Sequence, residues 1–183
     1  MVSITPSTRY SSVSIAMHWL MAILLAATAI TMEVRGMYPK GSEGRELIKT
    51  AHYMLGMVVF ALVWLRLIAR ATGTTPPIAP KLPTWQAILG HLVHIVLYVL
   101  MIGLPLLGWL ALSAKGKPVP LLWGLQLPML MAESRDAAHL LKETHEVAAR
   151  IGYGVLALHA GAALLHHYVF RDNTLLRILP GKR

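Results

Sequence analysis

The sequence has no cysteine and very few charges. Only 14% of its 183 residues are charged, whereas a soluble domain carries about 25%. A chain with so few charges cannot cover a globular surface in water, and its 56% hydrophobic content is too high for a disordered protein. The lack of cysteine excludes disulfides, iron–sulfur clusters, thiolate zinc sites and haem attached through a C-x-x-C-H motif. The class that remains is an integral membrane protein.

Long uncharged runs mark the membrane-spanning segments. A spanning helix needs about 20 mostly apolar residues, and uncharged runs cover residues 11–32, 50–65, 82–114 and 151–170. Together with their flanking residues, these runs predict transmembrane helices near 12–33, 47–69, 86–112 and 139–170. We therefore expect an all-α fold, with residues 1–183 forming one domain, an integral membrane four-helix transmembrane bundle.

The basic residues bear on the orientation of the chain. Four spans place both termini on one side, and the total numbers of basic residues on the two sides are nearly equal. The positive-inside rule gives most weight to cations next to the spans. Arg66, Arg70 and Arg171 at helix ends, with Lys182 and Arg183 in the tail, favour the cytoplasm for both termini.

The sequence holds nine histidines, more than its eight acidic residues. Ionisable side chains inside a membrane are costly and are candidates for function. The predicted spans contain His18 in the first, His52 in the second, His91 and His94 in the third, and His145, His159, His166 and His167 in the fourth.

Histidine spacing in the last span predicts two sites at different depths. His145 and His159 are fourteen residues apart, so they face the same way and lie about 21 Å apart along a helix axis. With alternating helix directions, His18 lies at the cytoplasmic level of His159, and His52 lies at the outer level of His145. Two pairs on opposing helices at two depths are the arrangement expected for two bis-histidine haems.

Other residues fit the same arrangement. Gly56 and Gly152 would let a bulky macrocycle approach the second and fourth helices. Arg66 is fourteen residues after His52, which places it at the cytoplasmic level, where it could pair with a haem propionate.

Two other interpretations of the histidines stay open on spacing alone. A single histidine in a membrane helix is often only hydrogen-bonded to a neighbouring helix. A haem-free metal transporter could instead use His91-x-x-His94 and the adjacent His166 and His167 as ligands.

Several short motifs, taken in order, resemble those of a known family. They are Ile-Ala-Met-His-Trp at 15–19, Met-Glu-Val-Arg-Gly at 32–36, Thr-Pro-Pro-Ile at 75–78, Gly-Leu-Pro-Leu-Leu-Gly at 103–108, His-Glu at 145–146, Gly-Tyr at 152–153, and the tail from Leu158 through His166-His167-Tyr168 to Arg177. In this order and spacing the chain resembles the prokaryotic cytochrome b-561 family over residues 9–183. Arg150 departs from the resemblance, because a smaller neutral residue is expected there.

The resemblance implies a di-haem protein of the bacterial inner membrane, with two haem b groups ligated by His18, His52, His145 and His159. It also implies oxidation of superoxide to dioxygen, with ubiquinone as the electron acceptor. The broader family includes cytochrome b subunits that relay electrons and anchor dehydrogenases or hydrogenases, and this is the alternative function. Beyond superoxide, ubiquinone and the lipid bilayer, we expect no nucleic acid and no obligate protein partner.

The implied reaction gives roles to two further groups of residues. Superoxide is an anion, so Arg35 and Lys115, on loops at the outer face, are candidates for guiding its approach, although basic residues are also ordinary at a membrane interface. Quinone reduction consumes protons, and histidine can donate and relay them. The candidate quinone contacts at the cytoplasmic level are His166, His167, His91 and His94.

Overall fold

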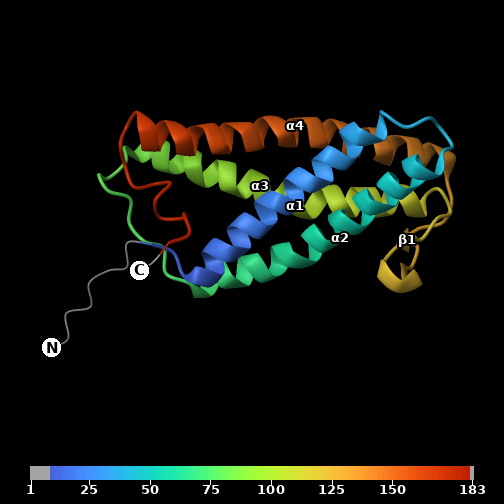
Figure 1. Cartoon of the computed structure of the whole chain (residues 1–183), viewed down its shortest axis with the longest axis horizontal. Coiled ribbons are helices and arrows are strands. Elements are labelled where there is room, and N and C mark those ends of the chain that lie inside the picture. The colour runs from blue at the N-terminus through green and yellow to red at the C-terminus, as the bar shows by residue number, and fades with distance from the viewer. Residues whose placement is uncertain (1–8, 182–183) are drawn as a thin grey trace.

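The computed structural model describes residues 9–181, and Lys182 and Arg183, counted above in the basic tail, lie outside this range. Four long helices run along one axis (Figure 1). Their bounds are Ser12–Arg35 for α1, Glu43–Thr72 for α2, Thr84–Ser113 for α3 and Arg135–Tyr168 for α4. All four are long and apolar enough to cross a membrane, so the predicted all-α transmembrane bundle is confirmed.

The helix ends differ from the predicted ones because of serine caps. Ser42 accepts a hydrogen bond from the backbone N–H of Arg45 and starts α2. Ser134 accepts one from Ala137 and starts α4. An N-cap satisfies backbone donors that a helix start leaves free. Both helices therefore begin four residues before the apolar pattern predicts, and they carry polar turns beyond the membrane.

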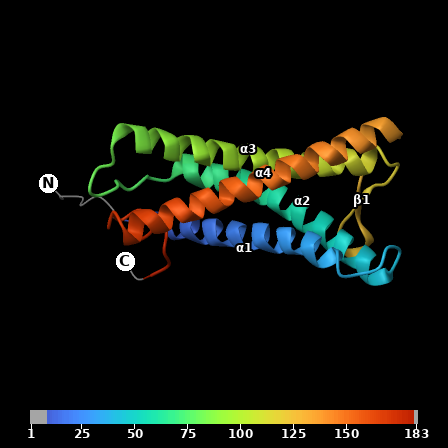
Figure 2. The same cartoon turned by 90° about the horizontal axis from the view of Figure 1, so that it is seen from above.

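A small hairpin between α3 and α4 is the one β element among residues 9–181. Strand β1, Val119–Pro120, pairs antiparallel with β2, Gln126–Leu127, around the short 3₁₀ helix η1, Leu122–Gly124. Trp109 Nε1 donates to the carbonyl of Pro128 at 2.9 Å and ties the hairpin to α3. We call the end of the bundle with this hairpin the outer end, and the end with both termini the inner end (Figures 1 and 2).

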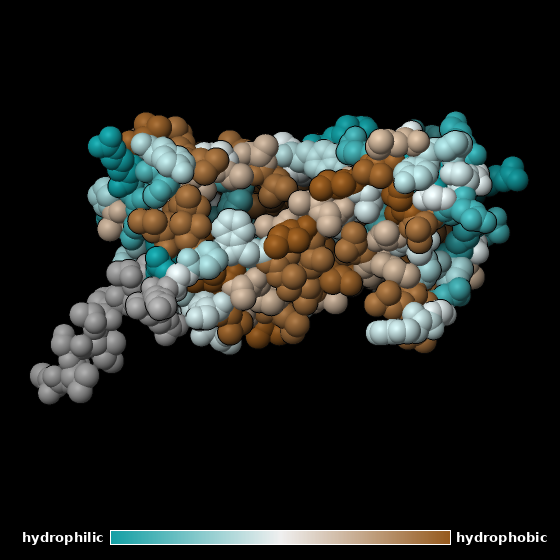
Figure 3. Space-filling model, viewed as in Figure 1, coloured by the Kyte–Doolittle hydropathy of each residue, from teal (hydrophilic) through white to brown (hydrophobic). Residues whose placement is uncertain are grey.

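The bundle is built from two helix pairs. α1 packs along α2, α3 packs along α4, and α2 also contacts α3. The most buried cluster is Met21, Val59, Val63 and Met101, and none of these residues, nor the hydrophobics packed against them, comes from α4. Helix α4 therefore takes no part in this buried cluster. On the face shown in Figure 3, apolar side chains cover most of the middle of the bundle, and polar residues gather towards both ends.

Candidate haem sites

The structure brings the four predicted ligands together as two pairs of rings. The rings of His52 and His145 have centroids 6.2 Å apart, at an angle of 77°. Those of His18 and His159 are 6.3 Å apart, at 63°. Helix α4 supplies one ring to each pair, and α2 and α1 supply the others. These are the pairs and helices that the spacing predicts.

The ring separations fit one metal between each pair. A metal-bound imidazole nitrogen lies about 2 Å from its metal, so two imidazoles on opposite sides of one iron have centroids roughly 6 Å apart. Both observed separations match this value. Each pair of rings therefore supplies the two imidazole ligands that one haem iron would accept.

At the outer pair, backbone carbonyls fix the histidine tautomer. His52 Nδ1 lies 3.1 Å from the carbonyl oxygen of Thr28, and His145 Nδ1 lies 2.9 Å from that of Leu104. A carbonyl only accepts, so each Nδ1 carries the proton and each Nε2 keeps its lone pair for a metal. The sequence analysis missed both partners, because a backbone carbonyl has no residue signature.

The glycines near the outer pair differ in what surrounds them. A Cβ added at Gly56 would meet no protein atom within 4 Å, and one at Gly152 would meet only the Leu100 and Leu104 side chains, the nearer at 3.6 Å. Both glycines line a cavity shared by all four helices, together with His52 and His145. Gly108, which the sequence does not mark as a site residue, has less free space beside it. A Cβ added there would lie 3.4 Å from His145 Cε1.

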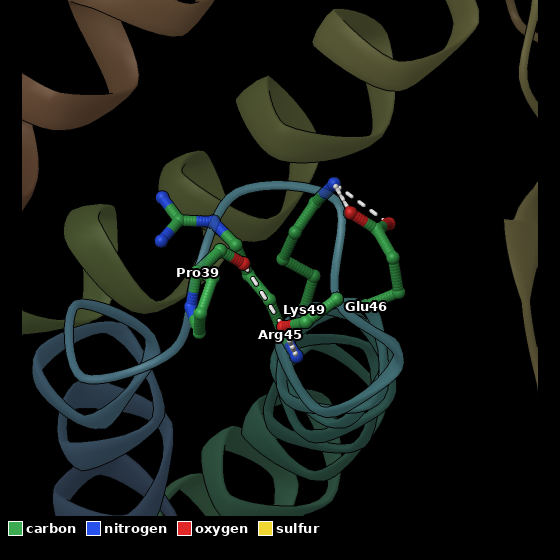
Figure 4. Close-up of polar contacts among 5 residues, drawn as sticks. Pro39, Arg45, Glu46 and Lys49 are labelled. Atoms are coloured by element: carbon green, nitrogen blue, oxygen red, sulfur yellow. Dashed lines mark hydrogen bonds and ion pairs between the residues drawn. The ribbon is translucent and has the colours of Figure 1, made fainter.

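The outer cavity continues into a mouth rich in cations. The mouth is lined by Glu33 and Glu146 and by six basic residues, Arg35, Arg45, Lys49, Lys115, Lys142 and Arg150. Three of the basic side chains are already engaged. Lys49 binds Glu46 at 2.8 Å (Figure 4), Lys142 binds Glu146 at 2.8 Å, and Arg45 donates to the carbonyls of Arg35 and Tyr38.

The remaining cations include both residues predicted to guide superoxide. Within residues 9–181, Arg35, Lys115 and Arg150 form no ion pair, and Arg35 Nε is buried without a hydrogen-bond partner. Burial, and then the neighbouring charges of Lys142 and Lys49, lower the pKa of Lys115 below its usual value. These side chains leave the mouth with uncompensated positive charge above the outer ring pair.

The inner pair has different surroundings. Arg66 Nη2 lies 3.0 Å from Nδ1 of His18, so in this structure Arg66 contacts a predicted haem ligand directly. A third ring, that of His94, lies 5.1 Å from the His159 ring. His91, three residues earlier on α3, is exposed and stays outside this group. The structure thus joins one predicted quinone contact, His94, to the inner ligands.

The other two candidate quinone contacts lie beyond the inner pair, at the end of α4. His166 Nδ1 is 2.6 Å from the buried carboxylate of Asp172, and His167 Nδ1 is buried with no hydrogen-bond partner in the described chain. Burial acts to raise the pKa of Asp172, but hydrogen bonds from Thr174 and His166 hold it below its usual value. Sequence reasoning missed Asp172, because its partner depends on the chain turning back after α4.

The segment after α4 closes the inner end. The buried Arg177 donates to the carbonyl of Pro76 and to the hydroxyl of Tyr10, and burial lowers the pKa of its guanidinium. Trp19 Nε1 donates to the carbonyl of Ile178 at 2.9 Å. These three contacts join this segment to Pro76, to Tyr10 near the start of the chain, and to Trp19, the residue next to His18.

Comparison with known proteins places this geometry in a family. The family model described as prokaryotic cytochrome b561 matches residues 9–181. The chain is 39% identical to "Cytochrome b561 homolog 1" of Escherichia coli K12 and 37% identical to "Probable superoxide oxidase CybB" of Yersinia pestis. Both matches cover 96% of this chain. They cover 99% of the E. coli protein and 98% of the Y. pestis protein. "Cytochrome b561 homolog 2" of E. coli K12 is 26% identical over 93% of this chain and 91% of that protein. With four spanning helices and histidine rings paired at two levels, the chain belongs to the prokaryotic cytochrome b561 family of haem b-binding membrane redox proteins.

Proposed function

We propose that this protein oxidises superoxide to dioxygen at its outer end and passes the electrons to ubiquinone through two b haems. The observation that carries the proposal is the stacking of two ring pairs along α4 beneath a mouth with unpaired cations. A relative of similar length is named a probable superoxide oxidase, which agrees with this assignment. The protein would lie in the bacterial inner membrane with both termini in the cytoplasm.

The first step is the approach of an anion. Superoxide becomes dioxygen by giving up one electron, so this step needs no general base or nucleophile. Arg35, Lys115 and Arg150 supply positive charge at the mouth that leads to His52 and His145. Positive charge focused in a cleft raises the arrival rate of an anion.

The second step is the transfer of electrons along α4. Haem b, when bound, supplies reversible one-electron storage at each level. The chain contributes two rings per haem and carbonyls that orient the outer ligands. Two superoxide ions deliver the two electrons that one quinone accepts, and two protons complete the quinol.

The quinone contacts are proposed at the inner end. His166 has its Nδ1 proton held by Asp172, so its Nε2 can donate to a quinone carbonyl when the ring carries both protons, and His167 has an unpartnered Nδ1. A histidine paired with a carboxylate is suited to hold and release a proton. His91 is exposed on α3 and fits this role less well.

The decisive experiment is stopped-flow reduction of the purified protein by superoxide, followed by reoxidation with a soluble ubiquinone. We expect two haems per chain, rapid reduction that superoxide dismutase abolishes, and quinol formed from two superoxide ions. A protein with two haems that superoxide does not reduce would contradict the proposal.

The alternative is an electron-relay subunit that anchors a dehydrogenase or hydrogenase. One observation favours it, which is the exposed, uncharged tip of the hairpin, where Trp123 is 91% exposed between the exposed residues Leu122 and Leu125. Such a tip could contact a partner protein. Co-purification with a soluble dehydrogenase from native membranes, together with slow reduction by superoxide, would support the alternative.

A further inference from the structure

A third histidine ring lies beside the inner ring pair. His94 on α3 has its ring 5.1 Å from that of His159, and the His18 ring lies 6.3 Å from that of His159. At the outer level, α3 instead places Gly108 against His145. Among the described residues, the third histidine ring is therefore a feature of the inner site only.

His94 is held in the tautomer that suits a metal ligand. Its Nδ1 lies 2.6 Å from the carbonyl oxygen of Gly90, one turn earlier on α3. Because the carbonyl accepts, Nδ1 carries the proton and Nε2 keeps a free lone pair. The outer ligands His52 and His145 are oriented by the same kind of bond.

His18 is held in the opposite way. A guanidinium only donates, so Arg66 makes Nδ1 of His18 an acceptor at 3.0 Å. The proton of a neutral His18 then lies on Nε2, the nitrogen that would face a metal. For His18 to bind iron, the proton and Arg66 must move, whereas His94 needs neither change.

The helix pairing separates the two possible ligands of the inner site. α3 packs along α4, so His94 and His159 belong to one helix pair. His18 lies on α1, in the α1–α2 pair, and its ring faces that of His159 across the two helix pairs. A haem held by His94 and His159 thus needs only the α3–α4 pair to be in place.

We propose that His94 is an alternative axial ligand of the inner haem, able to hold it with His159 when His18 is not bound. This inference rests on the proposal that the inner rings bind haem. In the exchange, an iron bond to His18 is replaced by one to His94 Nε2, and no electron is transferred. The two rings must move apart by about 1 Å to reach the separation of the other pairs.

The test removes His18 with and without the third histidine. The variants are His18→Ala and His18→Gln, each alone, with His94→Ala and with His91→Ala. His91 is the matched control, because it lies on the same helix and is exposed. The readouts are the haem-to-protein ratio and the low-spin signals in electron paramagnetic resonance, neither of which needs activity.

We expect both single His18 variants, and their combinations with His91→Ala, to keep most of the inner haem in a low-spin, six-coordinate state. Adding His94→Ala should remove it and leave one haem per protein. His94→Ala alone should keep two haems, because His18 is present. At the outer level, where α3 supplies no histidine, His52→Ala should lose its haem outright.

Two results would overturn the proposal. One is loss of the inner haem, or of the whole protein from the membrane, in both His18 variants. The other is an inner haem that is high-spin and unaffected by His94→Ala. Fewer than two haems in the unaltered protein would instead contradict the proposed function, so the two failures are distinguishable.

Discussion

The outer and inner ends of α4 present similar ring pairs in different settings. The outer rings are fixed by backbone carbonyls beneath an open, cation-lined mouth, while the inner rings contact an arginine and a third histidine. Ionisable groups at the inner end are also more buried, since Asp172 and Arg177 are 4% and 6% exposed. The outer ring pair thus lies below a cation-lined mouth, whereas the inner end of the bundle holds buried ionisable groups.

The largest expected effect is the loss of one haem from one end only. We expect His145→Ala to remove the outer haem and His159→Ala the inner haem, because each residue supplies one ring to one pair. His52→Ala should reproduce His145→Ala. The measurement is haem content with low-temperature absorption spectra. If a single variant removed both haems, the two ends would not be independent sites.

Positive charge at the outer mouth should raise the rate at which superoxide reduces the haems. The variant Arg35→Gln with Lys115→Gln should slow haem reduction by superoxide about tenfold at low ionic strength, since steering in a charged cleft contributes factors of this size. The effect should shrink as salt screens the charges. Lys40→Gln is the control, because Lys40 is exposed and does not line the mouth. An unchanged salt dependence in the double variant would mean that superoxide enters elsewhere.

Buried and exposed acids at the two ends should differ in their effect on stability. Asp172→Asn removes a carboxylate partner from His166 and should lower the free energy of unfolding by about 1–3 kcal/mol. Glu146→Gln, in a half-exposed pair with Lys142, should cost less than about 1 kcal/mol. Thermal unfolding in detergent at neutral pH measures both, and equal effects would contradict the contrast between the ends.

The same carboxylate should give the stability a pH dependence. The folded-state pKa of Asp172 is lowered, so its contribution is present above its unfolded pKa of about 3.9 and is lost as the pH falls through the folded value. The Asp172→Asn variant should therefore have a lower free energy of unfolding than the unaltered protein at neutral pH. On acidification its free energy of unfolding should fall less than that of the unaltered protein. Parallel acid profiles for the variant and the unaltered protein would show that Asp172 does not contribute in this way.

The smallest effects should come from two glycines at the outer site. Gly108→Ala places a Cβ 3.4 Å from His145 Cε1 and should shift the outer haem spectrum slightly. Gly56→Ala meets no protein atom within 4 Å, so any loss of outer haem would come from contact with the haem itself. We expect a modest loss of outer haem in Gly56→Ala and none of inner haem. Full occupancy would remove Gly56 from the haem-packing residues.

The sequence predicted the four helices and the two ring levels, because both depend on local periodicity. Apolar runs mark the spans, and the fourteen residues between His145 and His159 set their common face. The ends of α2 and α4 were missed, because Ser42 and Ser134 extend the helices into polar sequence.

Contacts between distant parts of the chain were beyond the sequence. The spacing predicts Arg66 at the inner level as a partner for a haem propionate, but it does not predict the contact of Arg66 with His18 that the structure shows. His94 was interpreted as a quinone contact, and only the packing of α3 on α4 brings it to His159. The Thr28 and Leu104 carbonyls belong to the backbone, which gives no residue signal for their role.

A consequence follows from α4 supplying one ring to each pair. The rise of a single continuous helix over fourteen residues, about 21 Å between the backbone positions, sets the vertical distance between the two ring pairs. Tilting of the α1–α2 pair as bilayer thickness changes would alter ring angles, but it would leave this spacing unchanged. Helix α4 would thus keep the distance between the two proposed haems constant while the α1–α2 pair adapts to the lipid around it.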